Sequence, residues 1–365
     1  MAILTVAFVL YFIFLVVLLT GWNKTPRALP PPLGYRNPQL SVIVPVRNEE
    51  NTLLILLRSI AAQEYKNFEV IVVNDDSEDE TLWVAEQAGM ANLKIIDNPG
   101  TGKKAAITAG VRAARGTIIV TTDADCTAPP GWLKQIAEHY RDPDVMLAFG
   151  PVRMEGDGFF FSVLQGMEFA SLVGTGAASA KLGFPTMCNG ANLSFRRNAF
   201  LNVGGYEGNI HVPTGDDEFL MRKVHARYPK GISFIHSSDA IVTTQAAPDI
   251  RSFLHQRIRW ASKWRFNSSF FSSALAVGVL LIQIAFVVNL AFLLSPAFMQ
   301  ALFLLAVKVI LEASFLLQVC RFLDTRWRWS TFFALQLFYP FYTLGIGIIS
   351  FFRPYEWKRR VFKPL

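Results

Sequence analysis

Three long stretches of this 365-residue chain contain no Asp, Glu, Lys or Arg, and they constrain the fold more than any other feature. They are residues 1–23, 266–307 and 329–352, with 23, 42 and 24 residues. A helix needs about 20 apolar residues to cross a bilayer, so these lengths predict one, two and one spans. We therefore expect an integral membrane protein with one N-terminal and about three C-terminal transmembrane helices.

Residues 24–265 have ordinary polarity and are numerous enough to bury a core of their own as one domain. The N-terminal stretch lacks the positive start and small-residue cleavage site of a secretory signal, and Lys24 and Arg27 follow it directly. This stretch is therefore predicted to be an uncleaved anchor in a bacterial cytoplasmic membrane. The domain that follows it would face the cytoplasm. The expected parts are an anchor (1–23), a soluble domain (24–265), C-terminal spans (266–352) and a basic tail (353–365).

The net charge of +7 is concentrated beside the apolar stretches. Basic residues in those places predict contact with anionic lipid headgroups, and we expect no nucleic-acid partner. Four spans that start outside would leave the tail outside, whereas its five basic residues favour the inside. Either one apolar stretch, such as the one broken by Pro340, is interfacial, or the charge rule fails here. The three cysteines are too few and scattered for a disulfide framework.

Within the soluble part, short β-branched runs at 40–46, 68–73, 93–96 and 116–122 alternate with helical patterns such as 50–63 and 103–114. This alternation predicts an α/β domain with a largely parallel, doubly wound sheet. The apolar segment 159–184, charged only at Glu168 and Lys181, predicts a pair of helices on the membrane surface.

Ligands of such a sheet bind outside the carboxyl ends of the strands, where this chain places polar residues. Arg47 and Glu49 follow the first run, Asp75 the second, and Asp123 and Asp125 the fourth. Uncompensated carboxylates repel one another, so Asp-x-Asp here predicts a hard divalent cation shared with substrate phosphates, as in a sugar nucleotide. Each residue alone would serve equally well as a turn or cap residue.

Seven segments resemble the family 2 glycosyltransferases with a GT-A fold, in particular the membrane-anchored group of cellulose, chitin and hyaluronan synthases and ceramide glucosyltransferase. In the donor half, about 40–126, the segments are SVIVPVRNEE, VVNDDSEDET, GKKAAITAG and TTDAD. In the acceptor half, about 145–265, they are CNGANLSFRRNAFLNVGGY, TGDDEFL and QRIRW. The resemblance covers about residues 40–265.

The resemblance implies donor-side roles residue by residue. Pro45, Arg47 and Glu49 would cradle the nucleoside, and Asp75 would contact the base, usually uracil. The chain has Asn74 where the family often has a second aspartate, which leaves uridine and guanosine both open. The remaining implied roles are a donor-loop lysine, Lys103, and a pair of carboxylates for Mg²⁺ or Mn²⁺ beside the diphosphate, Asp123 and Asp125.

The resemblance also implies a catalytic base, Asp217, preceded by the acidic Asp216. A carboxylate that takes the proton of an acceptor hydroxyl favours attack on the anomeric carbon. The alternative is that both aspartates cap a helix ending near Tyr228, and both can hold if Asp216 caps and Asp217 faces the site.

Gln256, Arg259 and Trp260 are spaced to share one face of a helix. In the family this face closes over the donor diphosphate, and Arg259 would stabilise charge on the leaving group. The simpler interpretation is a basic interfacial helix before a span, anchored by Arg251, Arg257, Lys263, Trp264 and Arg265.

The sequence therefore predicts an inverting, metal-dependent hexosyltransferase that transfers a sugar from a nucleotide diphosphate, with UDP favoured, to a lipid or lipid-linked glycan acceptor of the cell envelope. A processive polysaccharide synthase, completed by an oligomer or an export partner, is one alternative. A non-catalytic membrane sensor of sugar nucleotides or glycans is another.

Overall fold

The computed structural model describes residues 1–24, 37–210, 212, 214–262, 270–352, 355–357 and 360–362. Most of the Pro-rich stretch 26–38, the three residues Lys263, Trp264 and Arg265, and most of the basic tail fall outside these ranges. By its internal contacts the chain divides into two compact units. Unit 1 is Met1–Lys24, Glu155–Ser179 and Ala246–Leu365, and unit 2 is Thr25–Met154 and Ala180–Gln245. Two segments of the soluble domain expected at 24–265 thus belong to the unit that contains the apolar helices.

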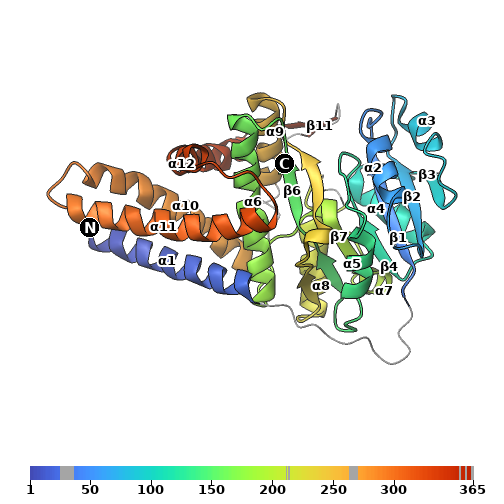
Figure 1. Ribbon diagram of the computed structural model, residues 1–365, viewed down its shortest axis with the longest axis horizontal. Helices are drawn as coiled ribbons and strands as arrows, with labels where there is room; N and C mark the ends of the chain where they lie inside the picture. The colour runs from blue at the N-terminus through green and yellow to red at the C-terminus, as the bar shows by residue number, and fades with distance from the viewer. Residues whose placement is uncertain are drawn as a thin grey trace. The chain divides into compact units, whose positions relative to one another are not determined.

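Unit 2 is built on a seven-stranded sheet in the order β3-β2-β1-β4-β7-β5-β8 (Figure 1). Strands β1 to β4 are parallel, and each one coincides with one of the predicted β-branched runs. β7 runs antiparallel to β4 and β5, so the other six strands run in one direction and the sheet is largely parallel, as the alternation predicts. The strands are β1 (Leu40–Val46), β2 (Phe68–Asn74), β3 (Leu93–Asp97), β4 (Ile118–Thr121), β5 (Leu147–Phe149), β7 (Leu193–Arg196) and β8 (Ile232–Phe234).

The order of the parallel strands creates a switch point between β1 and β4. From β1 the chain moves outward to β2 and β3, then returns past β1 to form β4. Because such crossovers are right-handed, the helices of the outward and return paths cover opposite faces of the sheet. Ligands of open α/β sheets bind at such a switch point. The helices are α2 (Leu53–Ala61) and α3 (Thr81–Glu86) on the outward path and α4 (Lys103–Ala113) on the return.

The second half of unit 2 adds short elements around β5, β7 and β8. A two-stranded sheet pairs β6 (Val152–Glu155) with β9 (Val242–Gln245). The buried side chains of Trp132, Leu133 and Ile136 dock α5 on the core, which extends the hydrophobic interior beyond the parallel strands. The helical elements are α5 (Trp132–His139), η1 (Gly190–Asn192), α7 (Arg197–Asn202), α8 (Asp216–Arg227) and η2 (Ser238–Ala240).

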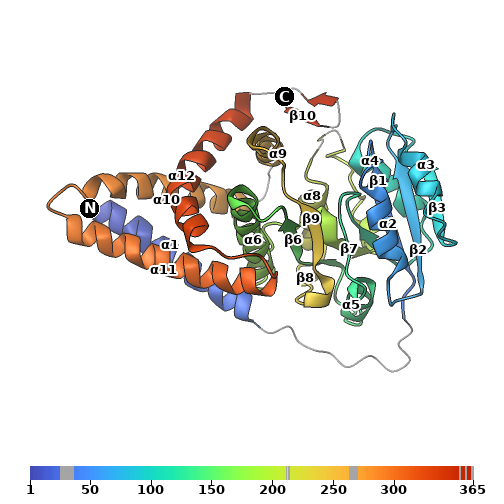
Figure 2. The ribbon, with the colours of Figure 1, turned by 45° about the horizontal axis from the view of Figure 1, so that its top comes forward.

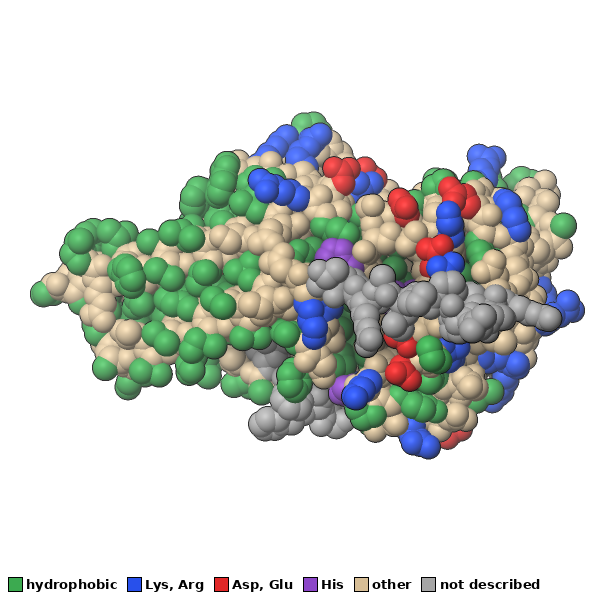
Figure 3. Space-filling model, turned by 60° about the horizontal axis from the view of Figure 1, so that its bottom comes forward, with side chains coloured by type: hydrophobic (Ala, Val, Ile, Leu, Met, Phe, Trp, Pro, Cys, Tyr) green, Lys and Arg blue, Asp and Glu red, His purple; other side chains and the backbone are tan. Residues whose placement is uncertain are grey.

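Unit 1 is helical, apart from a small hairpin of β10 (Tyr355–Trp357) and β11 (Arg360–Phe362). Three helices are long and apolar enough to cross a membrane, over Ala2–Asn23, Phe298–Phe322 and Trp329–Ser350, with a shorter apolar helix over Ala276–Phe292. On the face drawn in Figure 3, hydrophobic side chains cover much of this bundle, and Figure 2 shows the course of its helices. The helices are α1 (Ala2–Asn23), α6 (Phe160–Lys181), α9 (Ile250–Ser262), α10 (Phe270–Phe292), α11 (Phe298–Phe322) and α12 (Trp329–Phe352).

The structure sets the limits of α11 and changes the number of helices expected at 159–184. The charge-free stretch ends at Val307, yet α11 continues through Lys308 and Glu312 to Phe322. It can do so because the Lys308 ammonium lies 2.9 Å from the Glu312 carboxylate, so the two charges neutralise each other one turn apart. The pair of surface helices expected at 159–184 is the single helix α6. α12 likewise runs unbroken through Pro340.

Candidate active site

The carboxyl ends of the parallel strands bring three charged residues together in unit 2. The Lys103 ammonium, on the first turn of α4, lies 2.6 Å from Asp123 Oδ1, beyond the end of β4. The same nitrogen lies 3.2 Å from Asp216 Oδ2 at the start of α8. Burial by itself lowers the pKa of Lys103, but the two carboxylates outweigh it and raise that pKa well above its usual value. Lys103 is therefore a fixed positive charge.

Asp216 and Asp217 occupy the first turn of α8, and their roles differ from the expected division. The residue before the helix is Gly215, in the left-handed conformation with φ of 75°, and no side chain caps the helix there. Asp216 turns to Lys103, whereas Asp217 Oδ1 accepts a hydrogen bond from Glu218 N at 2.7 Å. Capping by Asp216 is thus wrong, and Asp217 carries the local backbone contact. Its other oxygen accepts from Gly190 N at 3.1 Å.

Gly190 brings the loop after α6 into close contact with this cluster. A Cβ atom at this position would lie 3.0 Å from Asp216 Oδ2 and 3.2 Å from Lys103 Nζ. Only glycine leaves those side chains undisturbed. Gly190 begins η1, which Asn189 opens by accepting a hydrogen bond from Ala191 N. The segment Cys188–Asn192 is therefore part of the cluster. Its glycine is required by the close packing against Asp216 and Lys103, and not only by the turn.

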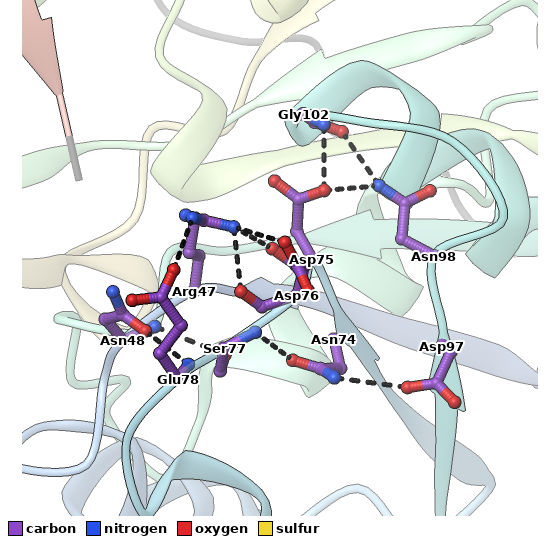
Figure 4. A network of polar contacts seen from close by, with 10 residues as sticks. All are labelled: Arg47, Asn48, Asn74, Asp75, Asp76, Ser77, Glu78, Asp97, Asn98 and Gly102. Carbon is purple, nitrogen blue, oxygen red and sulfur yellow. Dashed lines mark hydrogen bonds and ion pairs between the residues drawn. The ribbon is translucent and has the colours of Figure 1, made fainter. Parts of the chain in front are cut away.

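A polar network joins the ends of β1, β2 and β3 to the start of α4 (Figure 4). Asp75 Oδ1 accepts hydrogen bonds from Asn98 Nδ2 at 2.7 Å and from Gly102 N at 2.8 Å. Arg47 is buried and donates to the carbonyl oxygens of Asp75 and Asp76 at 2.7 and 2.8 Å. Asp75 thus fixes the residue just before Lys103, and Arg47 fixes the loop after β2.

The other two residues expected at the nucleoside lie on the first strand and just after it. Pro45 is paired with Val73 within the parallel ladder. Glu49 accepts a hydrogen bond from the Thr52 hydroxyl at 2.8 Å, and its own N–H donates to Thr81 Oγ1 at 2.7 Å. Both residues border the Arg47 loop at the carboxyl end of β1.

Asp123 and Asp125 fit a divalent cation only in combination with substrate oxygens. Asp125 is exposed, and Asp123 is about one-third exposed, at 38%. In the part of the chain that the structure describes, no three His, Cys, Asp or Glu side chains come close enough to hold a metal ion by themselves. Mg²⁺ is commonly bound by one or two carboxylates together with water and phosphate oxygens, so this donor set is chemically suitable.

Residues 41–204, which contain most of these side chains, match the family model described as Glycosyl transferase family 2. The chain carries a family 2 glycosyltransferase domain. The expected resemblance, the GT-A type of α/β fold and the glycosyltransferase class are thereby confirmed.

Relatives of the glycosyltransferase include an N-acetylglucosaminyltransferase of Rhizobium leguminosarum bv. viciae, 28% identical over 67% of this chain and 58% of that protein. An undecaprenyl-phosphate 4-deoxy-4-formamido-L-arabinose transferase of Pseudomonas aeruginosa is 37% identical over 27% of this chain and 31% of that protein. The chain thus spans less than two thirds of either relative.

The solved mannosyltransferase PcManGT of Pyrobaculum calidifontis, in complex with GDP-Man and Mn²⁺, has a similar fold. Its TM-score is 0.55 at 20% identity, and the alignment covers 96% of each chain. At that identity the likeness supports the fold of the glycosyltransferase and nothing more specific.

The remaining predicted residues, Gln256, Arg259 and Trp260, lie on α9 of unit 1. They do share one helix, as their spacing predicts. Trp260 packs near Phe169 of α6, with ring centroids 6.0 Å apart, and Gln256 Oε1 accepts a hydrogen bond from Arg257 at 2.5 Å. Their roles at the donor remain predictions.

Two residues of the glycosyltransferase site escape sequence reasoning. Asn98 follows β3 just as Asp75 follows β2, so inspecting the third strand end would have found it. Lys104 has the pattern of a solvated helix residue, yet it is 4% exposed and donates to Asn209 O at 2.8 Å. Its ammonium lies 4.5 Å from the ring centroid of Phe219 on α8, so it ties α4 to α8 beside Asp217.

Proposed function

We propose that this family 2 glycosyltransferase transfers a sugar, with inversion, from a nucleotide diphosphate donor to a lipid or lipid-linked acceptor at a membrane. The observation that carries the proposal is the cluster of Lys103, Asp123 and Asp216 at the switch point, with Asp217 beside it. A fixed cation between carboxylates is suited to a diphosphate that gains negative charge as it leaves.

The reaction needs one displacement and no covalent enzyme intermediate. The acceptor hydroxyl oxygen bonds to the anomeric carbon, while the bond from that carbon to the diphosphate oxygen breaks. Asp217 receives the hydroxyl proton, which makes the oxygen a better nucleophile in the transition state. The half-buried Asp217 carboxylate is held by Gly190 N and Glu218 N, so its orientation is set before the acceptor arrives.

Charge on the leaving nucleotide is balanced by cations of the chain. Lys103 is held by Asp75 through Gly102, so its place depends on the loop expected to contact the base. Arg259 is proposed as a second cation. Asp123 and Asp125 would hold Mg²⁺ or Mn²⁺, and when bound such an ion supplies Lewis-acid stabilisation of the diphosphate.

A lipid-linked acceptor is supported by the apolar helices and by a relative. Three helices could cross a membrane, and the Pseudomonas relative is named for transfer involving undecaprenyl phosphate. We propose that these helices span the bilayer and keep unit 2 in the cytoplasm, where nucleotide sugars are made. Anionic lipid headgroups would contact the basic residues beside the spans.

The deciding experiment measures nucleotide release by the membrane-embedded protein with Mg²⁺ or Mn²⁺ and membrane lipid, across UDP-sugars and GDP-mannose. GDP-mannose is included because the mannosyltransferase of similar fold was solved with GDP-Man. We expect release from one donor and a loss of at least about 100-fold in Asp217→Asn, because general-base catalysis contributes about that much.

The alternatives give different results in the same experiment. Radiolabelled product of polymer size would identify a processive synthase, whereas one sugar on a lipid supports single transfer. Donor binding without release by the folded protein would identify a sensor. Absence of both binding and release for every donor would contradict the proposed function.

A further inference from the structure

Between the predicted residues of α9 lies an arginine for which the proposed chemistry has no use. Arg257 is 4% exposed although its side chain is charged, and Glu168 of α6 is 5% exposed. Arg257 Nε lies 3.2 and 3.1 Å from the two oxygens of Glu168, and a terminal guanidinium nitrogen also donates to that carboxylate. Both residues belong to unit 1.

Such a buried pair adds little stability over two apolar side chains of similar size, because removing two charges from water offsets their attraction. Its distinctive property is geometry, since a guanidinium and a carboxylate joined by parallel hydrogen bonds hold each other in one orientation. The question is then which groups this fixed guanidinium orients.

Arg257 contacts two of the three residues expected at the donor. Its second terminal nitrogen donates to Gln256 Oε1 at 2.5 Å, and its guanidinium carbon lies 4.2 Å from the ring centroid of Trp260. The bond to Gln256 uses the amide oxygen, so the amide NH₂ is the end with donors for a phosphate oxygen. Arg257 therefore fixes both the orientation of that amide and the ring of Trp260.

The carboxylate is held in turn by an apolar helix. The Tyr342 hydroxyl of α12 donates to Glu168 Oε1 at 3.2 Å. Its ring stacks on Phe253, one turn before Arg257 on α9, with centroids 5.5 Å apart. A continuous set of contacts thus runs from α12 through Glu168 and Arg257 to Gln256.

We propose that Arg257 and Glu168 are positioning residues that hold Gln256 and Trp260 for sugar transfer and couple α9 to α12. This inference rests on the proposed function and deepens it. Neither residue touches the substrate; each acts through its neighbours.

The first test replaces the pair by apolar residues. Arg257→Met alone leaves Glu168 buried and unpaired, so it lowers both the thermal midpoint and kcat. In the double variant Glu168→Met with Arg257→Met, the midpoint returns toward that of the wild type. We expect kcat to stay reduced by about tenfold, with the donor Kd within about twofold, because the amide and the ring are no longer oriented. A double variant that regains wild-type kcat would overturn the proposal, since the pair would then be only structural.

A milder pair of variants decides the matter if the double variant does not fold. Tyr342→Phe removes one hydroxyl from Glu168, and Tyr11→Phe removes the hydroxyl that donates to Glu312 at 2.5 Å in the same unit. We expect kcat to fall several-fold only in Tyr342→Phe at similar thermal midpoints. Equal kcat values in the two variants would overturn the proposal. In either test, nucleotide release by the wild type shows whether the proposed function itself holds.

Discussion

Gly190 provides a test of the active-site cluster at the scale of one residue. Its φ is not in the left-handed region, so alanine brings no backbone strain, but the new Cβ lies 3.0 Å from Asp216 Oδ2 and 3.2 Å from Lys103 Nζ. Those side chains must shift by a few tenths of an ångström. We expect Gly190→Ala to lower nucleotide release about tenfold, with the free energy of unfolding changed by less than about 1 kcal/mol.

The matched control is Gly278→Ala on α10, where an added Cβ meets nothing within 4 Å. Turnover of this variant should equal that of the wild type. If Gly190→Ala were equally active, the close contact of the loop with Lys103 and Asp216 would have no bearing on turnover.

At the scale of an element, α5 joins the core partly through a half-buried histidine. His139 Nε2 lies 2.8 Å from Ser233 Oγ of β8, and burial lowers the pKa of His139 from 6.5 to about 4, against a weaker opposing effect of Asp142. Between those two pKa values the unfolded chain takes up a proton that the folded chain does not. The free energy of unfolding therefore falls as the pH is lowered from 6.5 to 4, by at most about 3 kcal/mol.

Thermal midpoints measured across this pH range would test the role of His139. His139→Gln should flatten the fall in stability toward acid, whereas His255→Gln, at an exposed position on α9, should keep the wild-type slope. A slope that is unchanged in His139→Gln would assign the acid sensitivity to other groups.

The limits of helices and strands could be predicted where they depend only on the pattern of the element itself. The predictions were wrong where contacts with a neighbouring helix change those limits. The strand at 40–46 and the helix starting at Lys103 agree with their periodicity. In contrast, the glycines of α6 do not interrupt it, because Gly174 lies against Val319 and Phe315 of α11, where an added Cβ would approach to 2.6 Å. α11 passes Lys308 because Gln336 of α12 and Glu312 bind its ammonium.

At the scale of the whole molecule, the apolar surface of unit 1 predicts stable membrane integration. Side chains such as Ile3, Phe303 and Leu294 are 89%, 64% and 93% exposed, which would be unfavourable in water. We expect the protein to stay in the membrane pellet after washing with alkaline carbonate and with high salt, and to need detergent for release. A peripheral membrane protein should be released in parallel, and release of this chain by either wash would contradict the spans.

The sequence by itself determined which polar residues follow the strand ends and where the apolar segments lie, because both depend on the residue pattern along single elements. The positions of Arg47, Asp75 and Asp123 could be predicted because each residue comes soon after the end of a strand. Only the tertiary structure decided that Lys103 joins Asp123 to Asp216, and that Glu168 turns inward to Arg257. Periodicity reports whether a side chain faces a core or solvent, whereas its partner depends on the strand order and on how helices distant in sequence pack together.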